Sequence, residues 1–417
     1  MTAQVVARLC MLAASATGLS HQFPELCRRQ SSSSSKASGP LTFGNDGTFK
    51  ISVFEDLHFG ENAWEAWGPA ADIKTVKVMN KVLDDARPDL VVLNGDLITG
   101  DNAYLQNATF VLDQLVGPMV DRGLPWASTY GNHDYQLNLT GSDILARERQ
   151  WPNSRTQRMV PGRGSGITNY YLPVYAPGGC AAGDDCAPEV VLWFFDSRGG
   201  FEYMQTKPDG SAALVGQQNW VDDSVVEWFK STNSDLNGRH GRDLPGVAFV
   251  HIPPRASRAV QSRGIDPERN PGINDDSPLS HQAEGWCGDG SQGGGEGCDY
   301  GGQDAAFMRA VAGSPGMIGV FSGHDHGNSW CARWEGEAGE AAADGRGVNL
   351  CFGQRTGYGG YGTWIRGSRQ LVLTRDMLAR GELDTSIRLE SGDVVGAVTL
   401  NSTYGDDRYP VTPDDRT

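Results

Sequence analysis

Residues 317–326 read MIGVFSGHDH, in which a short, mostly apolar run, Met317–Phe321, is followed by Ser322, Gly323 and the two histidines His324 and His326. A continuous apolar run of this length is typical of a buried strand. The glycine permits a sharp turn and a close approach of the backbone to its neighbours. The stretch therefore predicts a buried strand that delivers two imidazoles to one edge of a sheet.

The same arrangement recurs at four other places, where a strand candidate ends in acidic, amide or imidazole side chains. These are Phe49–Phe54 before Asp56 and His58, Leu90–Leu93 before Asp96, Pro125–Tyr130 before Asn132, His133 and Asp134, and Gly246–Val250 before His251. The carboxyl ends of strands form the ligand crevice of an open α/β sheet, so these side chains should converge. Each motif alone can be an ordinary turn or helix cap, but five in chain order predict a site.

The side chains in these motifs predict a site for two metal ions. Carboxylate, amide oxygen and imidazole together suit zinc, iron or manganese. Seven candidate ligands are too many for one ion, so two ions that share a carboxylate are expected. The seven are Asp56, His58, Asp96, Asn132, His251, His324 and His326. Because alternate residues of a strand point to the same side, residues 56 and 58, and likewise 324 and 326, should face one pocket. The other three histidines, His21, His240 and His281, lie in polar sequence and are expected to be solvated.

Strand and helix patterns alternate over the first three quarters of the chain. Helices are predicted over Ala71–Arg87, Leu105–Val120 and Gln217–Lys230, and a further strand over Val190–Phe195. Such alternation implies a parallel sheet with crossover helices. After Ser322 the pattern changes to strands with tight turns. These are expected at Trp330–Trp334, Val348–Phe352, Thr363–Thr374 and Val394–Leu400.

The N-terminal region is predicted to lie outside the folded domain. Residues 1–20 combine Arg8 with an apolar run at Leu9–Leu19 and resemble a signal peptide; a frayed N-terminus is the alternative. Residues 21–40, with five serines at 31–35, are predicted to be a flexible linker. We expect a single domain over residues 41–417, with polar loop insertions near 264–302 and 335–347.

Cysteine spacing also favours the secretory pathway. Three close pairs each enclose a polar loop, which predicts local disulfides. They are Cys180 with Cys186, Cys287 with Cys298, and Cys331 with Cys351. Cys10 would leave with the signal peptide, and Cys27 would remain. Glycosylation sequons stand at Asn107, Asn138 and Asn401.

Composition argues against two classes of protein. The chain has 35 Lys and Arg against 51 Asp and Glu, for a formal net charge of -16, which disfavours a nucleic-acid scaffold. No apolar run approaches the roughly 18–20 residues that span a bilayer. Glycine, at 55 of 417 residues, predicts long loops.

Taken together, the five motifs resemble the calcineurin-like metallophosphoesterase superfamily, whose pattern DxH, GD, GNHD, a lone histidine and GHxH they match over residues 49–326. Three segments, 250–253, 321–326 and 357–362, are similar to the branch related to purple acid phosphatases, often named "probable inactive purple acid phosphatase". Purple members have an iron-binding tyrosine three residues after the GD aspartate and lack the DxH histidine. Here Thr99 takes that position and His58 is present, so no purple colour is expected and the ligand set is complete. The resemblance implies an α/β fold, a four-layer α/β/β/α sandwich of two mixed β-sheets flanked by helices.

The resemblance also implies a role for each residue. Asp56, His58, Asp96 and His326 would hold one metal, and Asp96, Asn132, His251 and His324 the other. Two metals about 3.5–4 Å apart lower the pKa of a bridging water, which attacks the phosphate in line. His133 would protonate the leaving alkoxide, and Asp134 would orient its imidazole. Arg198 is a candidate for phosphate contact, with a position in a surface loop as the alternative.

The predicted function is hydrolysis of phosphate esters, monoesters favoured, by a secreted enzyme that uses two metal ions. The alternatives are a phosphodiesterase of the same fold, a metal-containing binding protein without activity, and an intracellular protein phosphatase. His133 disfavours the binding protein, because a dead scaffold has no use for an acid that is not a ligand. The close cysteine pairs disfavour the intracellular phosphatase.

Overall fold

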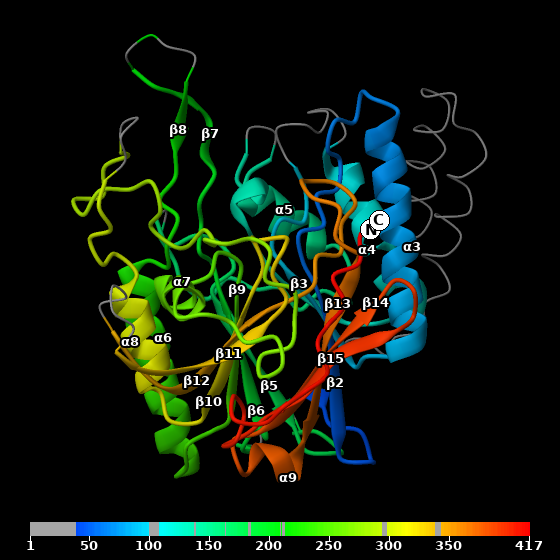
Figure 1. Ribbon diagram of the computed structural model, residues 1–417, viewed down its shortest axis with the longest axis vertical. Coiled ribbons are helices and arrows are strands. Elements are labelled where there is room, and N and C mark those ends of the chain that lie inside the picture. The colour runs from blue at the N-terminus through cyan, green and yellow to red at the C-terminus, as the bar shows by residue number, and fades with distance from the viewer. Residues whose placement is uncertain are drawn as a thin grey trace.

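Two large mixed β-sheets lie at the centre of the protein (Figure 1). The computed structural model describes residues 39–99, 108–136, 139–162, 164–181, 185–208, 210, 213–293, 298–337 and 343–417. The first sheet has seven strands, in the order β1 (Leu41–Thr42), β5 (Tyr170–Tyr175), β6 (Val190–Phe195), β9 (Gly246–Val250), β10 (Met317–Ser322), β12 (Asp344–Phe352) and β11 (Cys331–Glu337). The second has six, in the order β15 (Val394–Leu400), β14 (Leu383–Leu389), β13 (Gly367–Thr374), β2 (Thr48–Phe54), β3 (Leu90–Asn94) and β4 (Trp126–Thr129).

The two sheets bury their facing sides against each other. Phe49 and Val92 of the six-stranded sheet share one apolar cluster with Leu192 and Phe249 of the seven-stranded sheet. Every residue of β3 and of β9 is buried. Continuous apolar runs form these strands because one face meets the opposite sheet and the other face meets helices.

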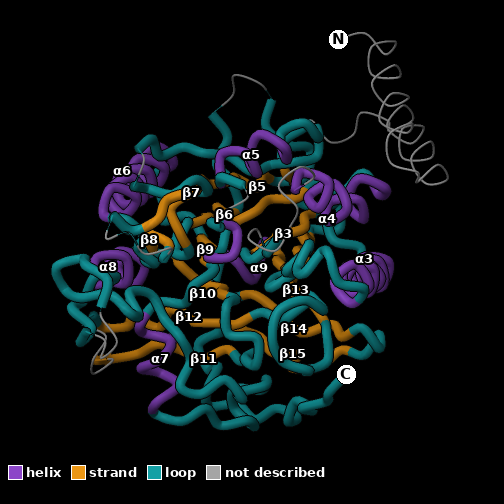
Figure 2. The backbone as a smooth tube through the Cα atoms, turned by 90° about the horizontal axis from the view of Figure 1, so that it is seen from above, coloured by secondary structure: helices purple, strands orange, loops and turns teal. Residues whose placement is uncertain are grey.

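Helices cover the outer face of each sheet (Figure 2). On the six-stranded sheet these are α3 (Trp67–Ala86), α4 (Ala108–Arg122) and α5 (Gly141–Glu148), and on the seven-stranded sheet α6 (Asp223–His240), α7 (Arg255–Ser262) and α8 (Ala305–Gly313). The order helix, sheet, sheet, helix confirms the predicted four-layer α/β/β/α sandwich.

The parallel pairing expected from the alternating strands and helices is present, and it lies within two mixed sheets. Strands β2, β3 and β4 are parallel and joined by α3 and α4, but they share their sheet with the antiparallel strands β13, β14 and β15. Strands β6, β9 and β10 are parallel in the other sheet. The strands that carry the motifs are therefore divided between two sheets, which places the predicted site where two sheet edges meet.

Several elements differ from the sequence-based expectations. The helix expected from residue 217 begins at Asp223, because the carboxylate of Asp222 caps it by accepting a hydrogen bond from Ser224 N at 3.0 Å. Strands β5 and β14 and helices α5, α7 and α8 were not predicted, nor was the short helix α9 (Arg375–Leu378). A hairpin of β7 (Phe201–Thr206) and β8 (Leu214–Gly216) projects beyond the layers in Figure 1 and was also not predicted.

All three predicted disulfides are present: Cys180–Cys186, Cys287–Cys298 and Cys331–Cys351. Cys331 and Cys351 face each other across the antiparallel pair β11–β12. No cysteine of the described residues is free.

Thiol titration tests this pairing in solution. Since six of the eight cysteines are paired, the denatured protein should show at most two reactive thiols before reduction and up to eight after it. Reductant-treated protein is the control for complete labelling. Six or more thiols before reduction would contradict the pairing.

The predicted insertions differ in form. Of the insertion predicted at 335–347, residues 335–337 end β11 and residues 344–347 begin β12, whereas residues 264–302 contain no helix or strand in their described part. Some of the predicted features lie outside the described residues. These are the predicted signal peptide at 1–20, nearly all of the predicted linker at 21–40, Cys10, Cys27, Asn107 and Asn138. Asn401 is half-buried at the end of β15.

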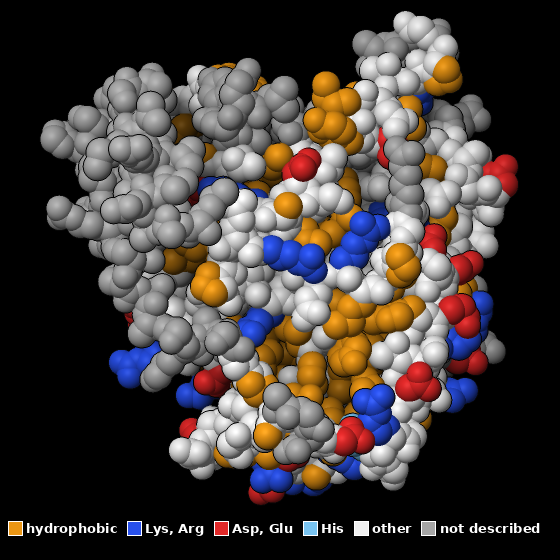
Figure 3. All heavy atoms as spheres, turned by 180° about the vertical axis from the view of Figure 1, so that it is seen from behind, with side chains coloured by type: hydrophobic (Ala, Val, Ile, Leu, Met, Phe, Trp, Pro, Cys, Tyr) orange, Lys and Arg blue, Asp and Glu red, His pale blue; other side chains and the backbone are white. Residues whose placement is uncertain are grey.

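The described surface has no membrane-spanning helix and carries charges of both signs. Within the described ranges, no helix is long and apolar enough to cross a bilayer. On the face shown in Figure 3, acidic and basic side chains both border a region of hydrophobic side chains, so neither sign of charge dominates this face.

Candidate metal centre

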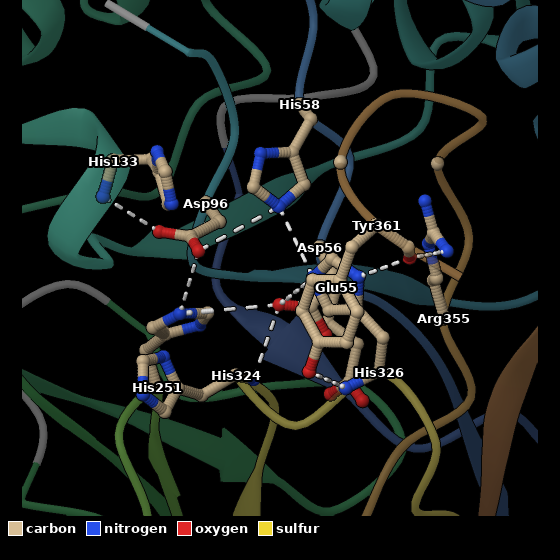
Figure 4. A network of polar contacts seen from close by, with 12 residues as sticks. Glu55, Asp56, His58, Asp96, His133, His251, His324, His326, Arg355 and Tyr361 are labelled. Carbon is tan, nitrogen blue, oxygen red and sulfur yellow. Dashed lines mark hydrogen bonds and ion pairs between the residues drawn. The ribbon is translucent and has the colours of Figure 1, made fainter. Parts of the chain in front are cut away.

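The predicted ligands converge at the junction of the two sheets (Figure 4). They come from the segments after β2, β3, β9 and β10, while Asn132 and His133 lie on a short 3₁₀ helix, Asn132–Asp134, after β4. Three overlapping groups of His and Asp each bring their ligand atoms within 4.8 Å of one another. The groups are Asp56 with His58 and His326, Asp96 with His251 and His324, and His58 with Asp96 and His133.

The backbone reaches this arrangement by a different route from strand alternation. Asp56, His58, Asp96 and His324 have φ values of 51°, 49°, 49° and 79°, in the left-handed region. Such values are uncommon outside glycine and mark sites where the surroundings impose the conformation. The residues thus face the pocket because the chain turns sharply past each strand end, and not because they alternate along a strand.

The first group is tightly packed around a shared centre. His58 Nε2 lies 3.2 Å from His326 Nε2, and His326 Nε2 lies 3.6 Å from Asp56 Oδ1. All three side chains are buried. Two imidazole nitrogens and a carboxylate oxygen therefore point at one small volume.

The second group is centred on Asp96. Its Oδ2 lies 3.1 Å from His251 Nε2 and also 3.7 Å from His58 Nε2 of the first group. His324 completes the group, and its backbone N donates to Asp56 Oδ1 at 3.0 Å. Asp96 thus lies between the two groups, as expected for a carboxylate that bridges two ions.

Backbone and hydroxyl partners orient three of the imidazoles. Nδ1 of His251 lies 2.9 Å from Asn94 O, and Nδ1 of His326 lies 2.9 Å from Tyr361 O. A carbonyl only accepts, so these Nδ1 atoms carry the proton and leave the Nε2 lone pairs free to bind a metal. Nδ1 of His58 lies 3.0 Å from the Thr99 hydroxyl, the residue at the position of the purple-enzyme tyrosine.

The donor set fits cations at this position. The Oδ1 of Asn132 is buried and makes no hydrogen bond within the described part of the chain. Unsatisfied buried acceptors are costly, and a metal ion would satisfy them. Carboxylate, amide and imidazole donors suit zinc, manganese or iron.

Electrostatics in the pocket also favour added positive charge. Burial and the neighbouring Asp96 raise the pKa of Asp56 to about 6, although His251 opposes the shift. Burial and His251 lower the pKa of His324 to about 3. Burial would lower the pKa of His251 as well, but Asp96 and Asp56 outweigh it and raise that pKa to about 10. In the absence of metal, a proton on His251 therefore partly compensates the two carboxylates.

His133 lies at the edge of this pocket, but Asp134 does not orient it. The half-buried His133 ring lies edge-on to His58 with centroids 4.8 Å apart, and its backbone N donates to Asp96 Oδ1 at 2.8 Å. The Asp134 carboxylate instead accepts from the backbone N of Leu97, Ile98 and Gly131 at 2.8–3.1 Å. Asp134 thus fixes the backbone beside Asp96.

The partner of the His133 imidazole is a residue that the sequence analysis missed. Gln136 Nε2 lies 3.1 Å from His133 Nδ1. The two residues are three apart in the sequence, on and just after a 3₁₀ helix whose period is three residues. This spacing of three residues could have predicted the contact between the two side chains.

Arg198 does not point at the pocket. Its guanidinium is buried, donates to Trp220 O at 2.6 and 2.9 Å and to Gly164 O at 2.8 Å, and lies over the Trp220 ring. Both expectations for Arg198, phosphate contact and an exposed loop position, are therefore wrong. The side chain ties loops together.

The expectation of solvated histidines also needs correction. His281 is buried, with Nδ1 2.7 Å from Gln282 O, and burial lowers its pKa. His240 is half-buried in the last turn of α6 and not in a loop. His21 lies outside the described residues.

Comparison with known proteins agrees with this geometry. The family model for calcineurin-like phosphoesterases matches residues 49–328. The chain belongs to the calcineurin-like phosphoesterase family, which confirms the resemblance drawn from the motifs.

Individual relatives share about a quarter of their residues with this chain or fewer. The chain is 26% identical over 370 residues to "Probable inactive purple acid phosphatase 14" of Arabidopsis thaliana, covering 83% of this chain and 80% of that protein. It is 27% identical over 246 residues to "Phosphatase DCR2" of Saccharomyces cerevisiae, covering 54% of this chain and 38% of that protein. Among solved structures, a dimetal phosphatase from Danio rerio is 13% identical, with a TM-score of 0.49 over 85% of this chain and 98% of that one.

Proposed function

We propose that this chain is a phosphoesterase that binds two metal ions and hydrolyses phosphate esters, with a preference for monoesters. The observation that carries the proposal is the pair of ligand groups joined through Asp96. Asp56, His58 and His326 would hold one ion with Asp96, and His251, His324 and Asn132 would hold the other with Asp96. When bound, two such ions supply a nucleophilic water and positive charge for the phosphoryl oxygens.

The protein's own residues would contribute orientation and a proton. His133 lies beside both His58 and Asp96, so its imidazole is within reach of an ester oxygen bound at the metals. The contact with Gln136 holds its ring in place. We therefore assign His133 as the group that protonates the leaving alkoxide. The buried Asp134 supports the turn that presents both Asn132 and His133.

Two alternatives keep the same fold. A phosphodiesterase would use the same ligands on a substrate with two ester bonds. A metal-containing binding protein would have the ligands without turnover, as the word "inactive" in the names of some relatives says of those proteins. The complete ligand set and the oriented His133 favour the enzyme. The three disulfides further support a secretory-pathway location.

Metal analysis combined with an ester screen tests the proposal. The purified protein should contain two metal ions per chain and hydrolyse p-nitrophenyl phosphate faster than bis(p-nitrophenyl) phosphate. Chelator treatment should remove activity, and zinc, manganese or iron should restore it, which identifies the working metal. Faster diester hydrolysis would favour the phosphodiesterase. Two bound ions without hydrolysis of either ester would favour the binding protein.

A further inference from the structure

The loop Gly357–Gly362, between β12 and β13, lies directly over one of the two ligand groups (Figure 4). We propose that this loop, through Tyr361 and Gly360, positions the ligands of one metal ion and not those of the other. The inference rests on the two-metal function proposed above. The loop would thus be a positioning segment, which neither binds the metals nor takes part in the reaction.

Tyr361 holds His326 through three separate contacts. The two rings are stacked, with centroids 4.0 Å apart and planes at 10°. The Tyr361 carbonyl accepts from His326 Nδ1 at 2.9 Å, and the Tyr361 hydroxyl accepts from His326 N at 3.1 Å. One residue thus sets the tautomer, the ring plane and the backbone position of this ligand.

Gly360 provides the close approach that this packing needs. Its φ is +70°, and an added Cβ would lie 2.7 Å from His326 Cε1 and 2.9 Å from His58 Cδ2. Real Cβ atoms do not come that close to a ring carbon. Any side chain at this position would therefore push both imidazoles out of place. The backbone N of Gly357 also donates to Asp56 O at 3.1 Å, so the loop contacts all three residues of the first group.

Buried and partly buried partners make the loop rigid. The guanidinium of Arg355, which is 1% exposed, donates to the carbonyls of Gly359, Tyr361 and Gly362. The Tyr361 hydroxyl donates to Asp276 Oδ2 at 2.8 Å. Because hydrogen bonds hold the loop at its carbonyls and at its tyrosine, the loop can keep the imidazoles of His326 and His58 in fixed positions.

The second ligand group has different supports. His251 is held by Asn94 O, and Asp96 Oδ1 accepts from His133 N. Within the described part of the chain, no hydrogen bond or ring contact joins the loop to His251 or His324. Substitutions in the loop should therefore lower the affinity for the ion bound by Asp56, His58 and His326 much more than the affinity for the other ion.

Zinc titration of the metal-free protein tests this inference. Tyr361 is 52% exposed, so Tyr361→Ala should leave the fold intact, which circular dichroism would check. We expect wild type to bind two Zn²⁺, and Tyr361→Ala and Gly360→Ala to bind one with unchanged affinity and the other about 10–100-fold more weakly, the usual cost of losing a ligand's support. Tyr361→Phe keeps the ring and the carbonyl, so it should recover much of the affinity.

Matched controls and a spectroscopic readout complete the test. Tyr203→Ala removes an exposed tyrosine from β7, and Gly117→Ala adds a methyl group where nothing lies within 4 Å. Both should bind two Zn²⁺ like wild type. In Co²⁺ titrations, the loop variants should lose the visible absorption of one ion and keep that of the other. The inference would be overturned if Tyr361→Ala and Gly360→Ala bound both ions with wild-type affinity, or if both variants lost affinity for the two ions equally. Either result would leave the proposed function standing. A wild-type chain that binds fewer than two Zn²⁺ would overturn the proposed function and the inference with it.

Discussion

Asp96→Ala is expected to remove both metal ions and to reduce ester hydrolysis to background. Asp96 Oδ2 lies 3.1 Å from His251 Nε2 and 3.7 Å from His58 Nε2, so the side chain belongs to both ligand groups. Without it, each ion loses a charged ligand and the connection to its neighbour. If the ions supply an acceleration typical of enzymes, the loss of kcat/KM should be roughly 10⁶-fold or more. Metal content per chain and p-nitrophenyl phosphate hydrolysis measure the two effects.

A second buried carboxylate provides the control for Asp96. Glu148 accepts hydrogen bonds from Trp126, Ser128, Tyr130 and Thr156 and is not among the clustered ligands. Glu148→Gln should therefore retain two metal ions and activity even if the protein becomes less stable. An Asp96→Ala variant that keeps wild-type activity would refute the two-metal assignment.

The ligands were predictable from the sequence because local and global signals agree at these positions. Strands β3, β9 and β10 are mostly apolar and β2 alternates, and each ends one or two residues before a metal-binding type of side chain. The seven candidate ligands can therefore be predicted without knowing how the strands pair. The reason for their convergence differs from the one predicted. Asp56 and His58 face the pocket because the backbone is left-handed at both residues, and not because they alternate along a strand.

The division into two sheets depended on long-range pairing that no local pattern contains. β2 pairs with β13, about 320 residues later in the chain, through register pairs such as Val53 with Arg369. β5 was missed because Pro173 lowers its strand signal. In the structure β1 pairs only with Val174 and Tyr175, so Pro173 lies beyond the last partner on that side.

The supporting residues were harder to predict, since their partners come from distant loops. Arg198 follows a strand, as a phosphate-binding arginine could, but Trp220, 22 residues later, accepts its hydrogen bonds. The position of His281 against Gln282 and Arg255 likewise depends on how the 264–302 segment folds back on α7. From the sequence, Arg198 resembled a phosphate-binding residue and His281 a solvated one. In the structure, both side chains are buried and hold loops together.

His133→Ala should leave two metal ions bound and slow turnover by about 10²–10⁴-fold for esters with poor leaving groups. His133 borders the ligand groups, but the seven other donors already supply both ions. Loss of its proton should matter little for p-nitrophenyl phosphate, whose leaving group needs little protonation, and much for an alkyl phosphate. Steady-state rates over a series of leaving groups, together with metal content, measure this difference.

The outcome separates the two roles that His133 could have. Its ring lies among the atoms of one clustered group with His58 and Asp96, so a ligand role is the direct competitor of the acid role. As a ligand, its removal would strip metal and slow all esters equally. As an acid, its removal would keep the metals and steepen the dependence of rate on leaving group. His240→Ala removes a half-buried histidine from the end of α6 and should change neither quantity, which makes it the control for loss of an imidazole elsewhere.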